Sequence, residues 1–526
     1  MSRKILKKAS QVGGLALASR CLAFIREFLI IRFLGIGAQS DAFLMAFRVP
    51  NSMRKIFAEG ALSSVLIPAL VKIDKERGNE GVNKLMTASF IVIQSLLFCF
   101  CAWVFFYSET LFAFTAPGFN PQQIIYAIKF VKILVSFILF TSASAVLAAA
   151  LQSKGKFFVP AVAPAVLNVF YIASLIFCLY FGCSTEFFCV CMAITSSIGF
   201  LLHLVVYFKH RLSFQLPDAQ AIKSFLNMMV TFFPYVVSMS IVEINFMIDA
   251  GFSSFLPAGS FSLIGYAFRF VGIPLGVIAT SFATVLLPKF SRIGVENKKD
   301  LSFNLFEAIK FIIWVTVPMI FLMGLFASEI FETLYSNGPE MVEKIAITRQ
   351  IFLVFLFGLL PFSLNRVLLN VYYALEKSTI PFIVSIVSCA VNFFMNGALI
   401  KFYGASGIAA ASVIAAVMQT VVYLFYLYAH LKLEFNMKHF AFFITRSIKQ
   451  WLIAFSIFFL IVQQMSNFIS LFQINISLFF FNLTTDFFLH SFGLWAWVGP
   501  IAIVFLLFLY QTRKHFGIEI SFLDNK

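Results

Sequence analysis

Charged residues interrupt a stretch between residues 40 and 67 that is otherwise apolar enough to span a membrane. Arg48, Arg54, Lys55 and Glu59 all lie within it. A charge at the bilayer centre costs roughly 2.5 to 3.5 kcal/mol on insertion scales, so such residues usually face water or a ligand. On an ideal helix Arg48, Lys55 and Glu59 fall within about 40° of one another. We therefore expect this stripe to face a cavity.

Further cations lie in other apolar segments of the chain. Arg20 and Arg26 belong to the preceding helix, and Arg269 occupies a similar setting in the second half. Guanidinium groups bind phosphate oxygens in bidentate fashion, so an excess of arginine facing a cavity predicts an anionic cargo. The alternative is internal pairing, for example between Lys55 and Glu59, which are four residues apart.

A second group of polar residues is less basic. Asp249 lies in an otherwise apolar run, and Asn392 and Asn396 are four residues apart on one helix face. A carboxylate with amide oxygens suits a hard monovalent cation such as Na⁺. Interhelical hydrogen bonding by the two asparagines is an equally good interpretation.

The composition identifies the elements that must position these residues. Of 526 residues 61% are hydrophobic and 12% are charged, and the mean hydropathy is +0.94, which is typical of a polytopic membrane protein. Apolar windows of about 20 residues recur along the chain, and we expect an all-α protein with about 14 transmembrane helices. The sequence has no His-Glu-x-x-His motif, phosphate-binding glycine loop or Walker pattern. We therefore predict a transporter without a cofactor rather than an enzyme, coupled to an ion gradient such as that of Na⁺, to the membrane potential or to a downstream sink.

The net charge of +16 has an explanation that does not involve nucleic acid. The basic residues are concentrated in alternate loops, where the positive-inside rule places the cytoplasm. This pattern predicts that the N- and C-termini are both cytoplasmic.

Two landmarks recur at nearly the same offset and indicate an internal repeat. Ala46-Phe47-Arg48 recurs as Ala267-Phe268-Arg269, about 221 residues later, and Asn168 recurs as Asn392, 224 residues later. Because six helices separate the copies, the repeat would be parallel, with the substrate path between its halves. We expect two six-helix lobes and two extra C-terminal helices with a short cytoplasmic tail, at residues 1–215, 216–432 and 433–526.

A long motif near the N-terminus resembles a known family. The motif consists of Ser19-Arg20-x-Leu-x-Phe-x-Arg26, Asp41-Ala42-Phe43 and the segment at 46–61. It closely resembles the N-terminal signature of the MurJ (MviN) lipid II flippases, and Thr115-Ala116-Pro117-Gly118-Phe119 extends the similarity. The resemblance covers essentially the whole chain. It implies the fold of the multidrug/oligosaccharidyl-lipid/polysaccharide exporter superfamily.

The same resemblance implies a function in peptidoglycan biosynthesis and cell shape. Lipid II, the undecaprenyl-pyrophosphate-linked peptidoglycan precursor, would be moved from the cytoplasmic to the outer leaflet of the bacterial inner membrane by alternating access. We expect a monomer that works with the cell-wall synthesis machinery. The alternative is a polysaccharide-lipid or multidrug exporter of the same fold. A membrane enzyme acting on polyprenyl lipids and an envelope scaffold are more distant alternatives.

The resemblance also implies roles for individual residues. Together with Arg48 from the stripe, the expected substrate-binding residues are Arg20, Arg26, Arg54, Glu59 and Arg269. Asp41 would have a gating or structural role, and Pro50 would kink the second helix. A sodium site would map onto Asp249, Asn392, Asn396 and Ser412. One departure is Gly272, where the family often has an acidic residue three positions after the arginine that Arg269 matches, and it places a charge pair on the helix expected at 260–288 in doubt.

Overall fold

The chain folds into helices that form two compact units, Met1–Ser262 and Leu263–Lys526. The computed structural model describes residues 3–55, 61–293, 297–335, 339–375, 377, 379–430, 437–471, 475–478, 481–484 and 492–524. Apart from one short hairpin, the elements in these ranges are helices, which confirms the predicted all-α fold. Ten helices among the described residues are long and apolar enough to cross a membrane. The total of about 14 spans stays a prediction.

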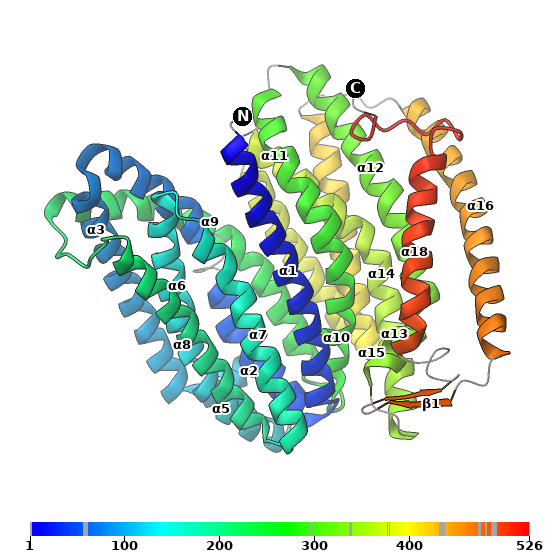
Figure 1. Cartoon of the computed structure of the whole chain (residues 1–526), viewed down its shortest axis with the longest axis horizontal. Helices are drawn as coiled ribbons and strands as arrows, with labels where there is room; N and C mark the ends of the chain where they lie inside the picture. Colours follow the sequence, from blue (N-terminus) through cyan, green and yellow to red (C-terminus); the bar gives the residue numbers. More distant parts are fainter. Residues whose placement is uncertain are drawn as a thin grey trace. The chain divides into compact units, whose positions relative to one another are not determined.

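Unit 1 contains nine complete helices and the start of a tenth among its described residues. They are α1 (Arg3–Leu34), α2 (Ala38–Arg54), α3 (Ala61–Phe106), α4 (Ser108–Thr115), α5 (Pro121–Leu134), α6 (Ser136–Ser153), α7 (Phe158–Phe181), α8 (Thr185–Lys209), α9 (Ala219–Ser253) and α10 (Ser260–Pro274). Within the unit α1 packs along α7, α2 along α5, and α3 along both α6 and α9 (Figure 1). These pairings bring the first two helices, which carry the expected arginines, against helices from much later in the chain.

Unit 2 is organised around α14. Its elements after α10 are η2 (Leu275–Thr280), α11 (Ser281–Ile293), α12 (Lys298–Leu325), α13 (Ala327–Leu334), α14 (Pro339–Ala374), α15 (Thr379–Ala429), α16 (Met437–Ser470), β1 (Asn475–Leu478), β2 (Phe481–Thr484) and α18 (Phe492–Thr512). Helix α14 packs against α11, α12 and α15. The two strands pair antiparallel, with Leu478 opposite Phe481.

Two of these helices are too long to be straight membrane spans. At 1.5 Å per residue, α3 and α15 would measure about 70 and 75 Å, more than twice the thickness of the hydrocarbon core. Each contains one glycine with left-handed backbone angles, Gly78 at φ 59° and Gly404 at φ 53°. A side chain strains that conformation, so glycine permits a break there. Each long helix is therefore two helical segments joined at a glycine.

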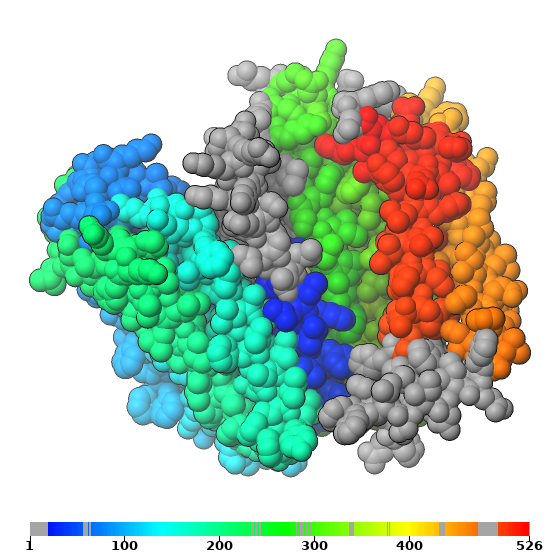
Figure 2. All heavy atoms as spheres, viewed as in Figure 1, coloured from blue at the N-terminus to red at the C-terminus, as the bar shows by residue number. Residues whose placement is uncertain are grey.

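The segment after α18 is part of the fold of unit 2. Ile518 and Ile520 are fully buried, and they belong to one apolar cluster with Trp314 of α12, Trp451 of α16 and Leu509 of α18. Helices α16 and α18 lie side by side in Figure 1, and in Figure 2 the segment beyond α18 covers one end of the unit. The cluster fixes the two C-terminal helices to α12.

A buried ion pair in α12 forms a hydrogen bond with this segment. Lys310 Nζ lies 2.6 Å from Glu307 Oε1, and the backbone N–H of Ser521 donates to Glu307 Oε2 at 2.7 Å. The Glu307 and Lys310 side chains are only 6% and 4% exposed. The pair therefore has a third, backbone partner from the far end of the chain.

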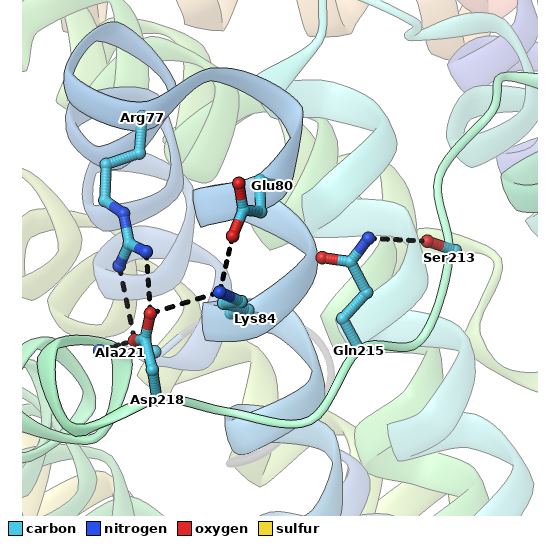
Figure 3. Close-up of polar contacts among 7 residues, drawn as sticks. All are labelled: Arg77, Glu80, Lys84, Ser213, Gln215, Asp218 and Ala221. Atoms are coloured by element: carbon cyan, nitrogen blue, oxygen red, sulfur yellow. Dashed lines mark hydrogen bonds and ion pairs between the residues drawn. The ribbon is translucent and has the colours of Figure 1, made fainter.

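The connection from α8 to α9 is attached to α3 by side chains (Figure 3). Asn83 donates to the Ser213 hydroxyl and accepts from the Ser213 backbone N–H. Arg77 donates to both oxygens of Asp218 at 3.2 and 2.6 Å, and Asp218 accepts from the backbone N–H of Ala221 at the start of α9. These contacts make α9 part of unit 1, whose boundary follows Ser262. The predicted lobes at 1–215 and 216–432, with two further helices at 433–526, stay a prediction.

Candidate functional site

Arg26 on α1 is held by a network from α7. Its Nη1 donates to Asn168 Oδ1 at 2.9 Å, and the Asn168 amide in turn donates to the backbone oxygen of Ser19 at 3.1 Å. Arg26 also pairs with Glu27 at 2.6 Å and lies 5.8 Å from the ring centre of Tyr171. The buried Nε–H of Arg26 has no acceptor among the described residues. The guanidinium is therefore fixed in place and retains a donor.

Arg54 lies at the last turn of α2, close enough to Arg26 for electrostatic interaction. Its Nε and Nη2 both donate to Asn51 Oδ1, at 3.1 and 2.9 Å. Asn51 is three residues earlier, a spacing that places two side chains on neighbouring positions of a helix surface. Arg26 and Arg54, two of the predicted substrate-binding arginines, are 28 residues apart in the chain and interact electrostatically within unit 1.

The cation stripe of α2 faces α9. Lys55 Nζ lies 2.9 Å from Glu243 Oε1, and the Ser52 hydroxyl donates to Glu243 Oε2 at 2.7 Å. Arg48 and Lys55 both lie over the ring of Phe246, at 5.5 and 5.6 Å from its centre. The spacing in the sequence allows Glu59 as a partner of Lys55, but Glu59 lies outside the described residues. The described partner of Lys55 is Glu243.

Arg48 makes a second contact with α9 through the backbone. Its Nη1 donates to the carbonyl oxygen of Phe246, and its guanidinium lies 5.0 Å from the ring centre of Phe261. Pro50 is buried within α2, which continues as a helix to Arg54. The stripe therefore ends beside Arg54, one of the predicted substrate-binding arginines.

Asp41 joins three segments of unit 1. Its Oδ1 accepts from the backbone N–H and the hydroxyl of Ser262, each at 2.7 Å. Its Oδ2 accepts from the backbone N–H of Gly259 at 2.6 Å and from the Gln123 amide at 3.3 Å. The residue is 2% exposed. These four donors describe a structural carboxylate that connects α2 to α5 and to the turn before α10.

The remaining predicted substrate-binding residues have different settings. Arg20 lies exposed on α1. Arg269 lies in unit 2, with its guanidinium 5.8 Å from the ring centre of Tyr266. A Cβ at Gly272 would meet no atom within 4 Å, so the space for a larger side chain exists there. A substrate-binding role for Arg20 and Arg269 stays a prediction.

The predicted sodium residues belong to two different units. Asn392, Asn396 and Ser412 lie on α15, where the Asn392 amide donates to the Ser412 hydroxyl at 3.4 Å and the Asn396 amide donates to Asn392 Oδ1. Asp249 lies on α9 in unit 1. The two asparagines thus form hydrogen bonds to other residues of α15, as the hydrogen-bonding interpretation of these residues predicts. The sodium site stays a prediction.

Three residues of this site were missed by the sequence analysis. Glu243 is a carboxylate inside an apolar run. The same signal drew attention to Asp249 and could have identified Glu243 as well. Asn168 entered only as a landmark of the repeat, and Tyr171 gave no signal among so many aromatic residues. Their roles depend on contacts with residues more than 100 positions away.

A family model described as "Lipid II flippase MurJ" matches residues 30–483. The chain belongs to the lipid II flippase MurJ family. A probable lipid II flippase MurJ of Buchnera aphidicola subsp. Schizaphis graminum is 27% identical over 466 residues, covering 87% of this chain and 90% of the relative. That of Rhizobium meliloti is 29% identical over 425 residues, covering 78% of each. This family consists of transporters, as the sequence predicted, and not of enzymes.

Solved structures agree on the fold. A lipid II flippase MurJ in an inward closed conformation has a TM-score of 0.75 at 23% identity and covers 96% of this chain and 99% of its own. An inward-facing multidrug resistance MATE transporter of the MOP superfamily has a TM-score of 0.60 at 15% identity, covering 78% and 97%. The chain is therefore a multi-pass membrane protein with the fold that MurJ shares with MATE transporters.

Proposed function

We propose that this chain is a lipid II flippase that moves its cargo from the cytoplasmic to the outer leaflet by alternating access. Membership of the MurJ family supports the lipid II cargo. The single structural observation that carries the proposal is the pair of arginines, Arg26 and Arg54, near each other within one unit. Two fixed guanidinium groups suit the two phosphates of a polyprenyl pyrophosphate.

The network around Arg26 explains how the site could bind an anion repeatedly. Asn168 and Tyr171 fix the guanidinium from one side, so less side-chain freedom is lost when the headgroup binds. Glu27 offsets part of the positive charge, which keeps the empty site from holding several uncompensated cations in the membrane. The undecaprenyl tail would stay in contact with lipid while the headgroup crosses.

A proteoliposome assay tests this function. Purified full-length protein is reconstituted with fluorescent lipid II, and the fraction accessible to an impermeant quencher is followed in time. Arg26→Ala and Arg54→Ala are expected to lower the rate of transfer at least tenfold, with Arg54→Lys intermediate because lysine lacks the bidentate fork. Arg32→Ala removes an exposed arginine from the same helix as Arg26 and serves as the matched control. Wild-type rates in both arginine variants would contradict the proposal.

The same vesicles separate a lipid II flippase from a multidrug or polysaccharide-lipid exporter of this fold. A polyprenyl pyrophosphate should compete with fluorescent lipid II, whereas a cationic drug should not, because the arginine pair repels cations. Competition by the drug alone would favour the alternative exporter.

The driving force is proposed to be a sodium gradient or the membrane potential. Vesicles with a sodium gradient, or with a potassium diffusion potential set by valinomycin, would show which one accelerates transfer. If sodium is the coupling ion, Asp249→Asn is expected to abolish the sodium effect while leaving a potential effect unchanged. Equal sodium stimulation in wild type and variant would exclude Asp249.

We further propose that the protein is a monomer in the bacterial inner membrane, with both termini in the cytoplasm, and that it works beside the cell-wall synthesis machinery. The distribution of basic residues over alternate loops supports this orientation. Labelling of single cysteines placed next to Lys4 and Lys514 with an impermeant maleimide in intact cells should fail, and it should succeed after permeabilisation.

A further inference from the structure

The carboxylate of Glu243 occupies two hydrogen-bond donors on the face of α2 that leads to Arg54. It accepts from the Ser52 hydroxyl at 2.7 Å and pairs with Lys55 at 2.9 Å. The Glu243 side chain is 11% exposed, but that of Lys55 is 40% exposed. A second ligand can therefore approach the ammonium group while the carboxylate is buried behind it.

We propose that Glu243 is an internal competitor for the cargo's pyrophosphate: it holds Lys55 when the site is empty and gives it up to a phosphate oxygen when the headgroup binds. This inference rests on the proposed lipid II function. A carboxylate and a phosphate present the same kind of acceptor to an ammonium group, so one can replace the other without leaving the cation unpaired. Glu243 also interacts electrostatically with Arg54, which places the exchange near the arginine pair.

The spacing of the contacts indicates that α2 and α9 stay attached during this exchange. Arg48, Ser52 and Lys55 share one face of α2, and Glu243 and Phe246 are three residues apart on α9. Arg48 donates to the Phe246 carbonyl oxygen. Release of Lys55 therefore removes one ion pair between the helices and leaves the Ser52–Glu243 and Arg48–Phe246 hydrogen bonds in place.

The charges predict what the competitor does to affinity. Arg54 interacts electrostatically with Arg26 and with the carboxylates of Glu243 and Glu27, and Glu243 also pairs with Lys55. Neutralising Glu243 adds one net positive charge where the pyrophosphate binds and frees Lys55 from competition. Pyrophosphate should then bind more tightly and leave more slowly. A residue with only a structural role would show no such gain when it is lost.

Glu243→Gln tests the inference, because glutamine keeps an acceptor for Ser52 but lacks the charge that holds Lys55. The measurement is the dissociation constant of geranylgeranyl pyrophosphate for the purified full-length protein, with geranylgeraniol as the uncharged probe. Binding of the pyrophosphate is expected to tighten about fivefold, as for loss of a partly exposed ion pair that competes with the ligand. Binding of the alcohol should not change. Transfer of saturating lipid II in proteoliposomes should slow.

Two further variants isolate the Lys55 contact. In a Lys55→Met background, Glu243→Gln should gain much less affinity, because the contested cation is gone. Glu109→Gln makes the same charge change at an exposed carboxylate on α4 and should leave the dissociation constant unchanged. If Glu243→Gln does not fold, Glu243→Asp replaces it, because its shorter carboxylate reaches Lys55 less well and should also bind the pyrophosphate more tightly than wild type.

The outcomes distinguish the inference from the proposed function. Unchanged or weaker pyrophosphate binding in the Glu243 variants, with normal binding and transfer by wild type, overturns the competitor role and leaves the flippase function standing. An equal gain in the Lys55→Met background also overturns it. Failure of wild type to bind the pyrophosphate or to transfer lipid II overturns the function itself, and the inference with it.

Discussion

Arg77 and Asp218, which are 141 residues apart in the chain, form an ion pair in which two guanidinium nitrogens donate to the two carboxylate oxygens. Lys84 adds a third contact to Asp218 at 3.3 Å (Figure 3). Because Asp218 also caps α9, this pair attaches the start of α9 to α3. At its other end, Ser254 accepts from the backbone N–H of Gly118. Helix α9 is thus attached to unit 1 at both ends, with the Glu243 contacts between them.

The capping contact predicts how stability depends on pH. The hydrogen bond from Arg77, followed by that from the Ala221 backbone N–H, holds the pKa of Asp218 well below its ordinary value of 3.8. A lowered folded-state pKa contributes stability that is fully present above pH 3.8 and is lost progressively as the pH falls from 3.8 toward the lower folded-state pKa. Wild type should therefore melt at a higher temperature than Asp218→Ala at pH 7, and the difference should shrink below about pH 4. A difference that stays constant to pH 3 would contradict the role of the charge.

Asp41→Asn should destabilise unit 1. An amide retains one acceptor oxygen, but its NH₂ group would face backbone and hydroxyl donors that now point at the carboxylate. Leaving buried donors without an acceptor costs about 2 kcal/mol, which corresponds to a fall in Tm of roughly 5 °C. Thermal unfolding in detergent measures it, with Asp300→Asn as a control at an exposed carboxylate. An unchanged Tm with abolished transfer would instead indicate a gating role.

Asn168→Ala should weaken lipid II binding without unfolding the protein, because Asn168 positions Arg26. Loss of that hydrogen bond is worth about 1 kcal/mol, or roughly fivefold in the KM for transfer. Asn168→Asp keeps an acceptor for Arg26 and should recover part of the loss. Ser174→Ala on the same helix removes a hydroxyl that donates to the Phe170 backbone and is the control. A purely structural role would lower the Tm of Asn168→Ala without changing the KM.

Ser521→Pro should destabilise unit 2, whereas Ser521→Ala should not. Proline removes the backbone N–H that donates to Glu307, and alanine keeps it. A buried carboxylate that loses a donor is expected to cost about 1 to 3 kcal/mol. Thermal unfolding of the two variants in the same detergent makes the comparison. Equal melting temperatures would show that the segment after α18 docks through its apolar residues alone.

The sequence was sufficient for the class of protein, and it named several residues of the candidate site. Hydropathy predicted a polytopic helical protein because the bilayer requires long apolar helices. The motif resemblance identified Arg26, Arg54 and Asp41, each of which has a described set of partners. Neither hydropathy nor the motif could predict which residue pairs with each charge. Glu243 and Asn168 act on residues 188 and 142 positions away, and a single sequence carries no distance between such positions.

The buried pair in α12 has a consequence for how the protein is made. Glu307 and Ser521 are 214 residues apart, so the helix that carries the glutamate is synthesised long before its third partner. During membrane insertion, therefore, the carboxylate must be accommodated by Lys310 alone or by a temporary substitute such as water. Folding of unit 2 should accordingly have a late step. In this step, docking of residues 517–524 supplies the last hydrogen bond to Glu307, in a helix that is already in the membrane.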